Sequence, residues 1–136
     1  MKAASVPKIA NSEFRHITEL IRRLINDSNF NVVIWTLKIA AVMAKGLRKY
    51  FYSAAKAQFF NIIGKFREKR TQMVDETNNT LNEFSHCIGI EDVLEDVKEG
   101  LADKAPNMRV NLLNWISKHI DQKAEDKGGE VPEKSR

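Results

Sequence analysis

Apolar residues recur along most of the chain at intervals of three and four, the spacing of one face of an α-helix. The pattern indicates six helical segments, and no segment alternates with the period of two that marks a strand. We therefore expect an all-α protein whose helices are joined by short turns. The segments cover, in approximate bounds, residues 12–26, 30–48, 53–66, 71–86, 90–102 and 106–120.

Turn and capping residues lie between the periodic segments. Ser12 is a candidate N-cap of the first helix, and the segment 27–29 (Asp-Ser-Asn) can end that helix and cap the next. Gly46 falls near the end of the second helix, and Pro106 fits the first position of the last one. Residues 30–48 leave little polar face, so we expect their helix to be sandwiched between neighbours.

A weak internal repeat connects three of these helices. The segments 28–33, 69–74 and 105–110 open their helices in a similar way, and equivalent valines in them are 41 and 36 residues apart. Two helices in a period near 40 residues are typical of HEAT-type repeats, whose helical hairpins stack in a row. The sequence therefore predicts an α-solenoid of HEAT-like hairpins.

Read continuously, DSNFNVVIWTLKIAAVMAKGLRKYFYSAAKAQFFNIIGKFREKR and the later IEDVLEDVKEGLADKAPNMRV resemble the TOG domain of the microtubule-polymerase family. The most specific pieces are DSN before the apolar helix, AKGLRKYF, KFREKR and KAPNMR, in this order and spacing. The resemblance covers residues 12–120. It implies a paddle of HEAT-like repeats that binds αβ-tubulin along one thin edge.

In TOG domains the tubulin contacts come from the loop inside each helix pair. The resemblance places those loops here at residues 45–53, at 85–90 and beyond 120. Because tubulin is acidic, the resemblance implies a tubulin-binding set of exposed basic residues that offer charge-assisted hydrogen bonds. This set consists of Lys45, Arg48 and Lys49 on the first loop, with Lys118 and Lys123 flanking the last. The structural alternative is that Lys45, Arg48 and Lys49 only stabilise the C-terminus of their helix by interacting with its dipole.

A full TOG domain has about six repeats, and the resemblance aligns this chain from the second helix of the second repeat to the first helix of the fifth. The tryptophan-bearing loop of the first repeat has no counterpart, because Trp35 and Trp115 fall inside apolar helices. We expect apolar faces at the two ends to be under-covered and to favour self-association. Those faces are built on Phe14, Leu20 and Leu24, and on Leu113 and Ile116.

Composition is consistent with one globular domain: 136 residues, 43% apolar and 29% charged. We place the domain at residues 12–120, between a flexible N-terminus (1–11) and a disordered polar tail (121–136). Charge is polarised along the chain, since residues 45–70 carry +7 and residues 71–103 carry −8. Such a chain can offer a basic surface to an acidic partner, or its two stretches can neutralise each other across a helix interface.

Other basic and acidic residues have simpler interpretations. The basic residues Lys65, Arg67, Lys69, Arg70 and Arg109 lie on turns between repeats, on the edge opposite the tubulin-binding set. We expect them to be solvated or to pair with the acidic stretch. The acidic run is expected to form a solvated helix face; its members are Glu91, Asp92, Glu95, Asp96 and Glu99.

The sequence offers little for catalysis or metal binding. Cys87 is the single cysteine, which excludes an internal disulfide and favours a reduced intracellular compartment. His86 and Cys87 lack a second ligand pair, so we predict no metal site. No phosphate-binding loop, HExxH or nucleophile elbow occurs, and we predict no enzyme activity, cofactor or small-molecule substrate. The longest apolar run, 32–44, is too short to span a membrane, so we expect a soluble protein.

The resemblance implies a non-enzymatic tubulin-binding module of a microtubule-associated protein that promotes microtubule growth or spindle organisation. It implies a cytoplasmic location on microtubules, spindle poles or centrosomes, with αβ-tubulin as partner. One alternative is a generic HEAT-repeat scaffold for another protein. A basic solenoid that binds nucleic acid is a second alternative, because Phe59, Phe60 and Phe66 lie among basic residues, although helical spacing favours a core role for them.

Overall fold

In a computed structural model, residues 11–126 are described, and they form α-helices and short 3₁₀ turns with no strand among them. The all-α prediction is therefore confirmed. The α-helices of the described part are α2 (Asn11–Leu24), α3 (Phe30–Leu47), α4 (Tyr52–Ile63), α5 (Thr71–Phe84), α6 (Leu94–Leu101) and α7 (Pro106–Asp126). The 3₁₀ turns are η2 (Arg48–Phe51), η3 (Gly64–Arg67) and η4 (Ile90–Val93).

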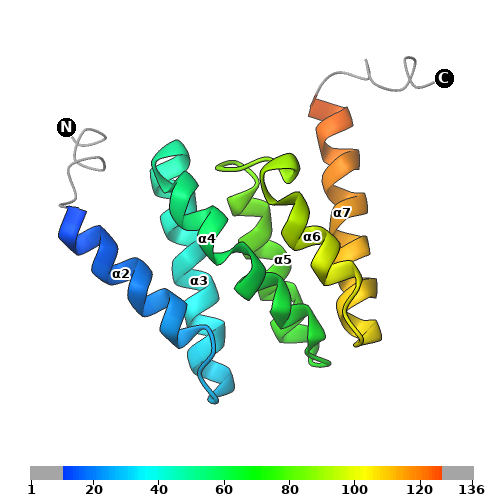
Figure 1. Cartoon of the computed structure of the whole chain (residues 1–136), viewed down its shortest axis with the longest axis horizontal. Helices are drawn as coiled ribbons and strands as arrows, with labels where there is room; N and C mark the ends of the chain where they lie inside the picture. The colour runs from blue at the N-terminus through cyan, green and yellow to red at the C-terminus, as the bar shows by residue number, and fades with distance from the viewer. Residues whose placement is uncertain (1–10, 127–136) are drawn as a thin grey trace.

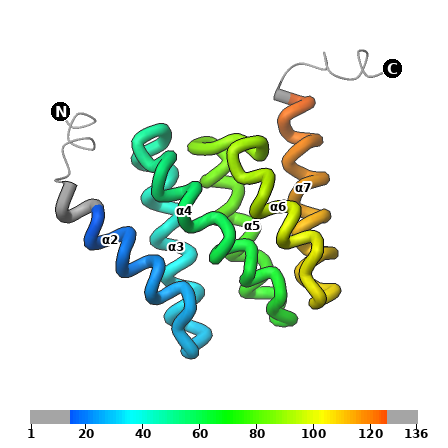
Figure 2. The backbone as a smooth tube through the Cα atoms, in the orientation of Figure 1, coloured from blue at the N-terminus to red at the C-terminus, as the bar shows by residue number. Residues whose placement is uncertain are grey.

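The helices stack sideways in two layers, as predicted for a solenoid of helical hairpins (Figure 1). Helices α2, α4 and α6 form one layer, and α3, α5 and α7 form the other and run in the opposite direction (Figure 2). The three helices that begin with the repeated sequence segments, α3, α5 and α7, all lie in the second layer. Two edges result. The loop edge holds η2, residues 85–90 and the end of α7, and the turn edge holds residues 25–29, 64–70 and 102–105.

The core lies between the two layers and runs continuously from α2 to α7. Large aromatic rings fill it, and Phe51 meets Phe84 edge-on with ring centroids 5.5 Å apart. Phe59 and Phe66 are equally inaccessible to solvent. Phe60 is partly buried and packs against the same core. The three phenylalanines at positions 59, 60 and 66 are therefore core residues, which removes the stacking platform that a nucleic-acid interface on them would need.

Polar bonds join successive helices of the second layer. Between α3 and α5, the Thr80 hydroxyl donates to the Leu37 carbonyl (2.9 Å), and Lys38 pairs with Glu76 (2.6 Å). Between α5 and α7, the Trp115 indole N–H donates to Asn82 Oδ1 (3.1 Å). The register between repeats is thus fixed by directional bonds as well as by apolar packing.

The helix boundaries confirm some sequence predictions and correct others. The segment 27–29 ends α2, and Asn29 caps α3 by accepting from the backbone N–H of residues 31 and 32. Ser12 is not the N-cap of the first helix, because α2 already includes Asn11; a single capping preference does not fix a boundary. Helix α7 continues to Asp126, so the predicted disordered tail is wrong for residues 121–126.

That last error has a physical cause. Residues 121–126 are polar and show no apolar period, but glutamine, lysine, alanine and glutamate among them favour helix. They extend a helix whose first turns are already packed, which avoids the cost of nucleation. Residues 1–10 and 127–136, with the rest of the predicted flexible ends, lie outside the described residues.

Helix α3 is not sandwiched all round, contrary to the prediction. Trp35, Ile39 and Val42 are 63%, 48% and 69% exposed, on the side opposite its buried residues. The span Phe30–Arg67 is long and apolar enough to pass a test for a membrane helix. It folds back at η2, however, and 44% of its most apolar window is buried inside the structure. Core helices of soluble proteins pass the same test, so this is weak evidence for a membrane segment.

Candidate functional site

The tip of the α3–α4 hairpin exposes a short basic segment between two buried anchors. Leu47 is 6% exposed and Phe51 is fully buried, and they hold the two ends of the turn η2 in the core. Between them, Arg48, Lys49 and Tyr50 point to solvent. With Lys45, which is exposed in the last turn of α3, this places the first predicted basic trio together on the loop edge.

Arg48 has an unusual backbone conformation. Its φ is 50° and its ψ is −125°, and no other non-glycine residue in the described part of the chain has a positive φ. The Arg48 N–H donates to the Ala44 carbonyl and so closes the end of α3. A side chain in a region that favours glycine costs on the order of 1–3 kcal/mol and is typical of functional sites. The turn thus carries local strain at the position of an exposed cation.

Two tyrosines flank the basic trio and were missed by the sequence analysis. Tyr50 is 57% exposed and Tyr52 is 37% exposed. The Lys49 ammonium lies 5.7 Å from the centre of the Tyr50 ring, and the Lys56 ammonium lies 5.9 Å from that of Tyr52. The only available signal was the run Tyr-Phe-Tyr, in which the buried Phe51 leaves its neighbours facing outward. We call the resulting surface the basic–aromatic cluster: Lys45, Arg48, Lys49, Tyr50, Tyr52 and Lys56.

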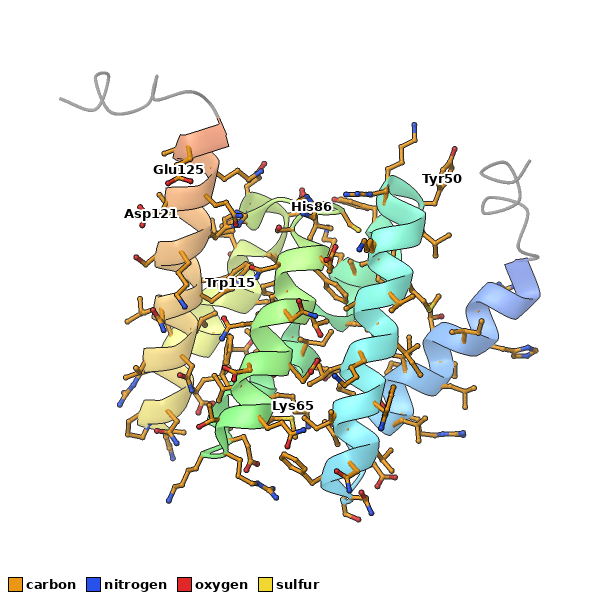
Figure 3. The ribbon with its side chains drawn as sticks, turned by 180° about the vertical axis from the view of Figure 1, so that it is seen from behind. Tyr50, Lys65, His86, Trp115, Asp121 and Glu125 are labelled. Atoms are coloured by element: carbon orange, nitrogen blue, oxygen red, sulfur yellow. The ribbon has the colours of Figure 1, made fainter. Side chains whose placement is uncertain are left out.

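The second loop, residues 85–90, packs beside the first. Cys87 Sγ donates to the Ala44 carbonyl (3.5 Å), so the thiol ties this loop to the end of α3. Burial raises the pKa of Cys87 above its ordinary value, and the nearby Arg48 charge only partly offsets the rise. The thiol is therefore protonated at neutral pH and acts as a structural donor. His86 remains exposed on the loop edge (Figure 3).

The third part of the loop edge is the end of α7. An open groove of ≈ 420 Å³ separates it from the second loop and is lined by Gly89, Ile90, Glu91, His119, Ile120, Lys123 and Ala124. His119 forms its buried wall and stacks on Trp115, with ring centroids 5.2 Å apart. Burial lowers the pKa of His119, with smaller contributions from Lys123 and His86. The imidazole is thus neutral at physiological pH.

Lys118 and Lys123, the two predicted tubulin-binding lysines of α7, differ in their position relative to the groove. Both are exposed, and Lys123 lines the groove at the loop edge. Lys118 lies more than a turn earlier and is not part of the groove lining. Five residues correspond to about 140° around a helix, so the two side chains leave α7 on different sides. Lys123 is therefore the one that continues the basic loop edge.

Basic residues on the turn edge are largely engaged within the chain. Arg67 holds Asp103 through Nε (3.2 Å) and Nη2 (2.9 Å), as predicted for pairing with the acidic stretch. Arg70 pairs with Glu68 (2.6 Å), and its guanidinium lies 3.9 Å from the centre of the Phe30 ring. Burial lowers the pKa of Lys65. By contrast, no ion pair within the described residues involves Lys45, Arg48 or Lys49.

The acidic run on η4 and α6 is partly a solvated face, as predicted. Glu91, Glu95 and Glu99 are exposed, while Asp92 caps η4 by accepting from the Gly89 N–H (2.9 Å). Burial, with the nearby Glu99 and Glu95, raises the pKa of Asp96. No group of three His, Cys, Asp or Glu side chains within residues 11–126 is placed to hold a metal ion.

Known proteins similar to this chain were found among curated sequences. No protein-family model matches it, and no solved structure matches it significantly. Protein MOR1 of Oryza sativa subsp. japonica is 33% identical over 118 residues, and Protein MOR1 of Arabidopsis thaliana is 30% identical over 118 residues. Each alignment covers 85% of this chain and 6% of the relative.

More distant relatives carry names that refer to the spindle or the centrosome. Protein mini spindles of Drosophila melanogaster is 27% identical over 115 residues, which is 84% of this chain and 6% of that protein. Centrosomal protein 224 of Dictyostelium discoideum is 23% identical over 117 residues, 85% of this chain and 6% of that protein. The chain thus spans 6% of the length of these relatives and is a distant homologue of one segment of each.

Proposed function

We propose that this chain is a non-enzymatic, TOG-like module that binds αβ-tubulin through its loop edge and acts with microtubules at spindle poles or centrosomes. The relatives support the cellular setting, because their names include mini spindles and a centrosomal protein. The two-layered helical fold agrees with the resemblance of the sequence to TOG domains.

One observation carries the choice of edge. Lys45, Arg48 and Lys49 are exposed together on one hairpin tip and form no ion pair within the described chain. On the turn edge, Arg67 and Arg70 are paired. The unpaired cations there, Lys69, Lys104 and Arg109, are divided between the turn before α5 and the region where α7 begins. Free cations can form charge-assisted hydrogen bonds with a partner's carboxylates without first losing an internal bond. Tyr50 adds an exposed aromatic ring of the type that is enriched at protein interfaces. The loop edge is therefore the better surface for an acidic protein.

The experiment compares two triple charge reversals. The loop-edge variant is K45E/R48E/K49E, and the matched control K69E/K104E/R109E changes the net charge equally with exposed residues of the turn edge. Lys69, Lys104 and Arg109 form no ion pair within the described residues. The Arg109 charge contributes to lowering the pKa of Asp103, so unfolding of the control also checks that the Arg67–Asp103 pair is kept. Circular dichroism and urea unfolding establish that both variants fold.

Binding is measured by co-migration with soluble tubulin on size exclusion, at two salt concentrations. We expect the loop-edge variant to lose about tenfold or more in affinity and the control to change little. The wild-type interaction should weaken with salt, since exposed charges are screened beyond about 8 Å at physiological ionic strength. Equal losses in both variants would instead indicate binding to total positive charge, as for nucleic acid. If wild type does not bind tubulin at tens of micromolar (roughly −6 kcal/mol), the tubulin-binding function is wrong and the generic HEAT-repeat scaffold for another protein remains.

A further inference from the structure

Apolar side chains are exposed at both ends of the two-layered stack. On α7, Val110, Leu113 and Ile120 are 63%, 54% and 57% exposed, and their spacing places them on one face together with Ser117. We call these four residues the α7 end face. At the other end, Leu20 of α2 with Trp35 and Ile39 of α3 are 44%, 63% and 48% exposed, and we call them the α3 end face. In α5, the helix between α3 and α7 in the same layer, the solvent-exposed residues are polar and include Gln72, Asp75 and Asn79.

The repeat itself indicates what the α3 end face is built to contact. When α3, α5 and α7 are aligned at their first residues, Ile39, Thr80 and Trp115 occupy the same position; this register shifts α7 by one residue from the one that aligns the three valines of the sequence repeat. Thr80 and Trp115 each bond to the preceding helix of the layer, through Leu37 and Asn82, and are 0% and 3% exposed. Ile39 has the same place in its repeat but is 48% exposed. It therefore lies where a preceding α7-like helix would pack.

A second equivalent set agrees with this register. Trp35, Glu76 and Asn111 share one position. Glu76 binds Lys38 of the preceding helix. The Asn111 amide donates to the Phe66 carbonyl (3.0 Å) in η3, the turn between α4 and α5, so it too bonds to a part of the fold that precedes its own helix. Trp35 has no preceding pair in the described structure, and its indole is largely exposed. Trp35 and Ile39 of the α3 end face thus occupy positions that bond to a preceding part of the fold in the later repeats.

The α7 end face is the counterpart. Leu113 is equivalent to Leu37, which is fully buried and accepts the Thr80 hydrogen bond from the following helix. Ser117 is equivalent to Asn82, which accepts the hydrogen bond from Trp115 of the following helix. In α7 both positions are exposed. The two ends of the molecule therefore present the two halves of an interface that the fold already uses internally.

We propose that copies of this chain associate head to tail, with the α7 end face of one copy packed on the α3 end face of the next. Helices α3 and α7 run in the same direction, so stacking preserves both the layers and the order of the helices (Figure 1). At the loop edge, Asp121 and Glu125 are exposed near the end of α7 (Figure 3), where Lys123 instead lines the groove. Arg15 is exposed near the start of α2 and is complementary in charge to these two carboxylates. The interface joins two different faces, so it is heterologous, and each added copy leaves one face of each kind open until the stack closes into a ring. This inference does not depend on tubulin binding.

The test uses one variant for each face of the full-length chain. Leu113→Glu places a charge on the α7 end face, and Ile39→Glu places one on the α3 end face. Asn79→Glu adds the same charge to the exposed face of α5 and is the matched control. Sedimentation equilibrium measures the average mass from about 10 to 500 µM, the range of a weak interface. Urea unfolding confirms that each variant retains its fold.

We expect wild type and Asn79→Glu to gain mass with concentration, and each end-face variant to remain a monomer, with association weakened by at least tenfold. An equimolar mixture of Leu113→Glu and Ile39→Glu should form pairs and nothing longer, because each variant keeps the face that the other has lost. A wild type that stays monomeric would overturn the proposal. So would persistent dimers of either variant alone, which would indicate contact between identical faces, or a mixture that remains monomeric.

Discussion

A single methyl group added at two helical glycines should have opposite effects on the free energy of unfolding. Gly46 lies in α3, and a Cβ atom built on it meets nothing within 4 Å. Gly46→Ala therefore gains helix propensity at no packing cost, which stabilises the fold by about 0.5–1 kcal/mol.

Gly100 lies buried in α6, where three side chains converge on it. A Cβ atom there would lie 2.7 Å from Leu112 Cδ2 and 3.1 Å from both Ile63 Cδ1 and Met108 Cε. These side-chain ends must move, and overpacking of this kind costs about 1–3 kcal/mol. The propensity gain is common to both variants, so Gly100→Ala should be less stable than Gly46→Ala by this amount, about 1–3 kcal/mol.

Urea unfolding followed by circular dichroism measures both free energies, and equal slopes would show that the unfolded states are comparable. A double-mutant cycle with Leu112→Val then tests the cause, because shortening the nearest side chain should relieve part of the cost, with a coupling of about 0.5–1.5 kcal/mol. The reasoning fails if Gly100→Ala stabilises the protein as much as Gly46→Ala does. It also fails if the cycle is additive.

Two further predictions concern single polar side chains. Because burial lowers the pKa of His119, the unfolded chain binds a proton first as the pH falls below about 6.5, so the free energy of unfolding should decrease from pH 7.5 to 5.5. Urea unfolding of His119→Gln should show a smaller decrease over this range. A variant with the same pH profile as wild type would contradict the assignment. Asn29→Ala removes the N-cap of α3 and should lower the thermal midpoint through a loss of about 0.5–2 kcal/mol, whereas Asn26→Ala in the exposed turn before it should have little effect.

The sequence by itself determined the local structure and its order. Apolar spacing is a property of the helix geometry, so it located the helices of the described chain, and α3 and α5 begin where the pattern places them. The capping segment 27–29 was also readable, because Asn29 bonds only to its immediate neighbours. The repeat near 40 residues correctly grouped α3, α5 and α7 in one layer, and the loops that the resemblance named at residues 45–53 and 85–90 lie on one edge.

Tertiary structure alone decided which apolar and charged side chains are free. Leu37 and Leu113 have equivalent places in the repeat, but one is buried and the other is 54% exposed, because only Leu37 has a following helix beside it in the described chain. Arg67 and Arg48 are both exposed arginines at helix ends, and Arg67 is paired because the chain brings Asp103 to it from 36 residues away. The positive φ of Arg48 depends on how the turn closes between Leu47 and Phe51. Local pattern encodes the helix, whereas burial, pairing and strain depend on neighbours that are distant in the chain and are fixed only when the layers pack.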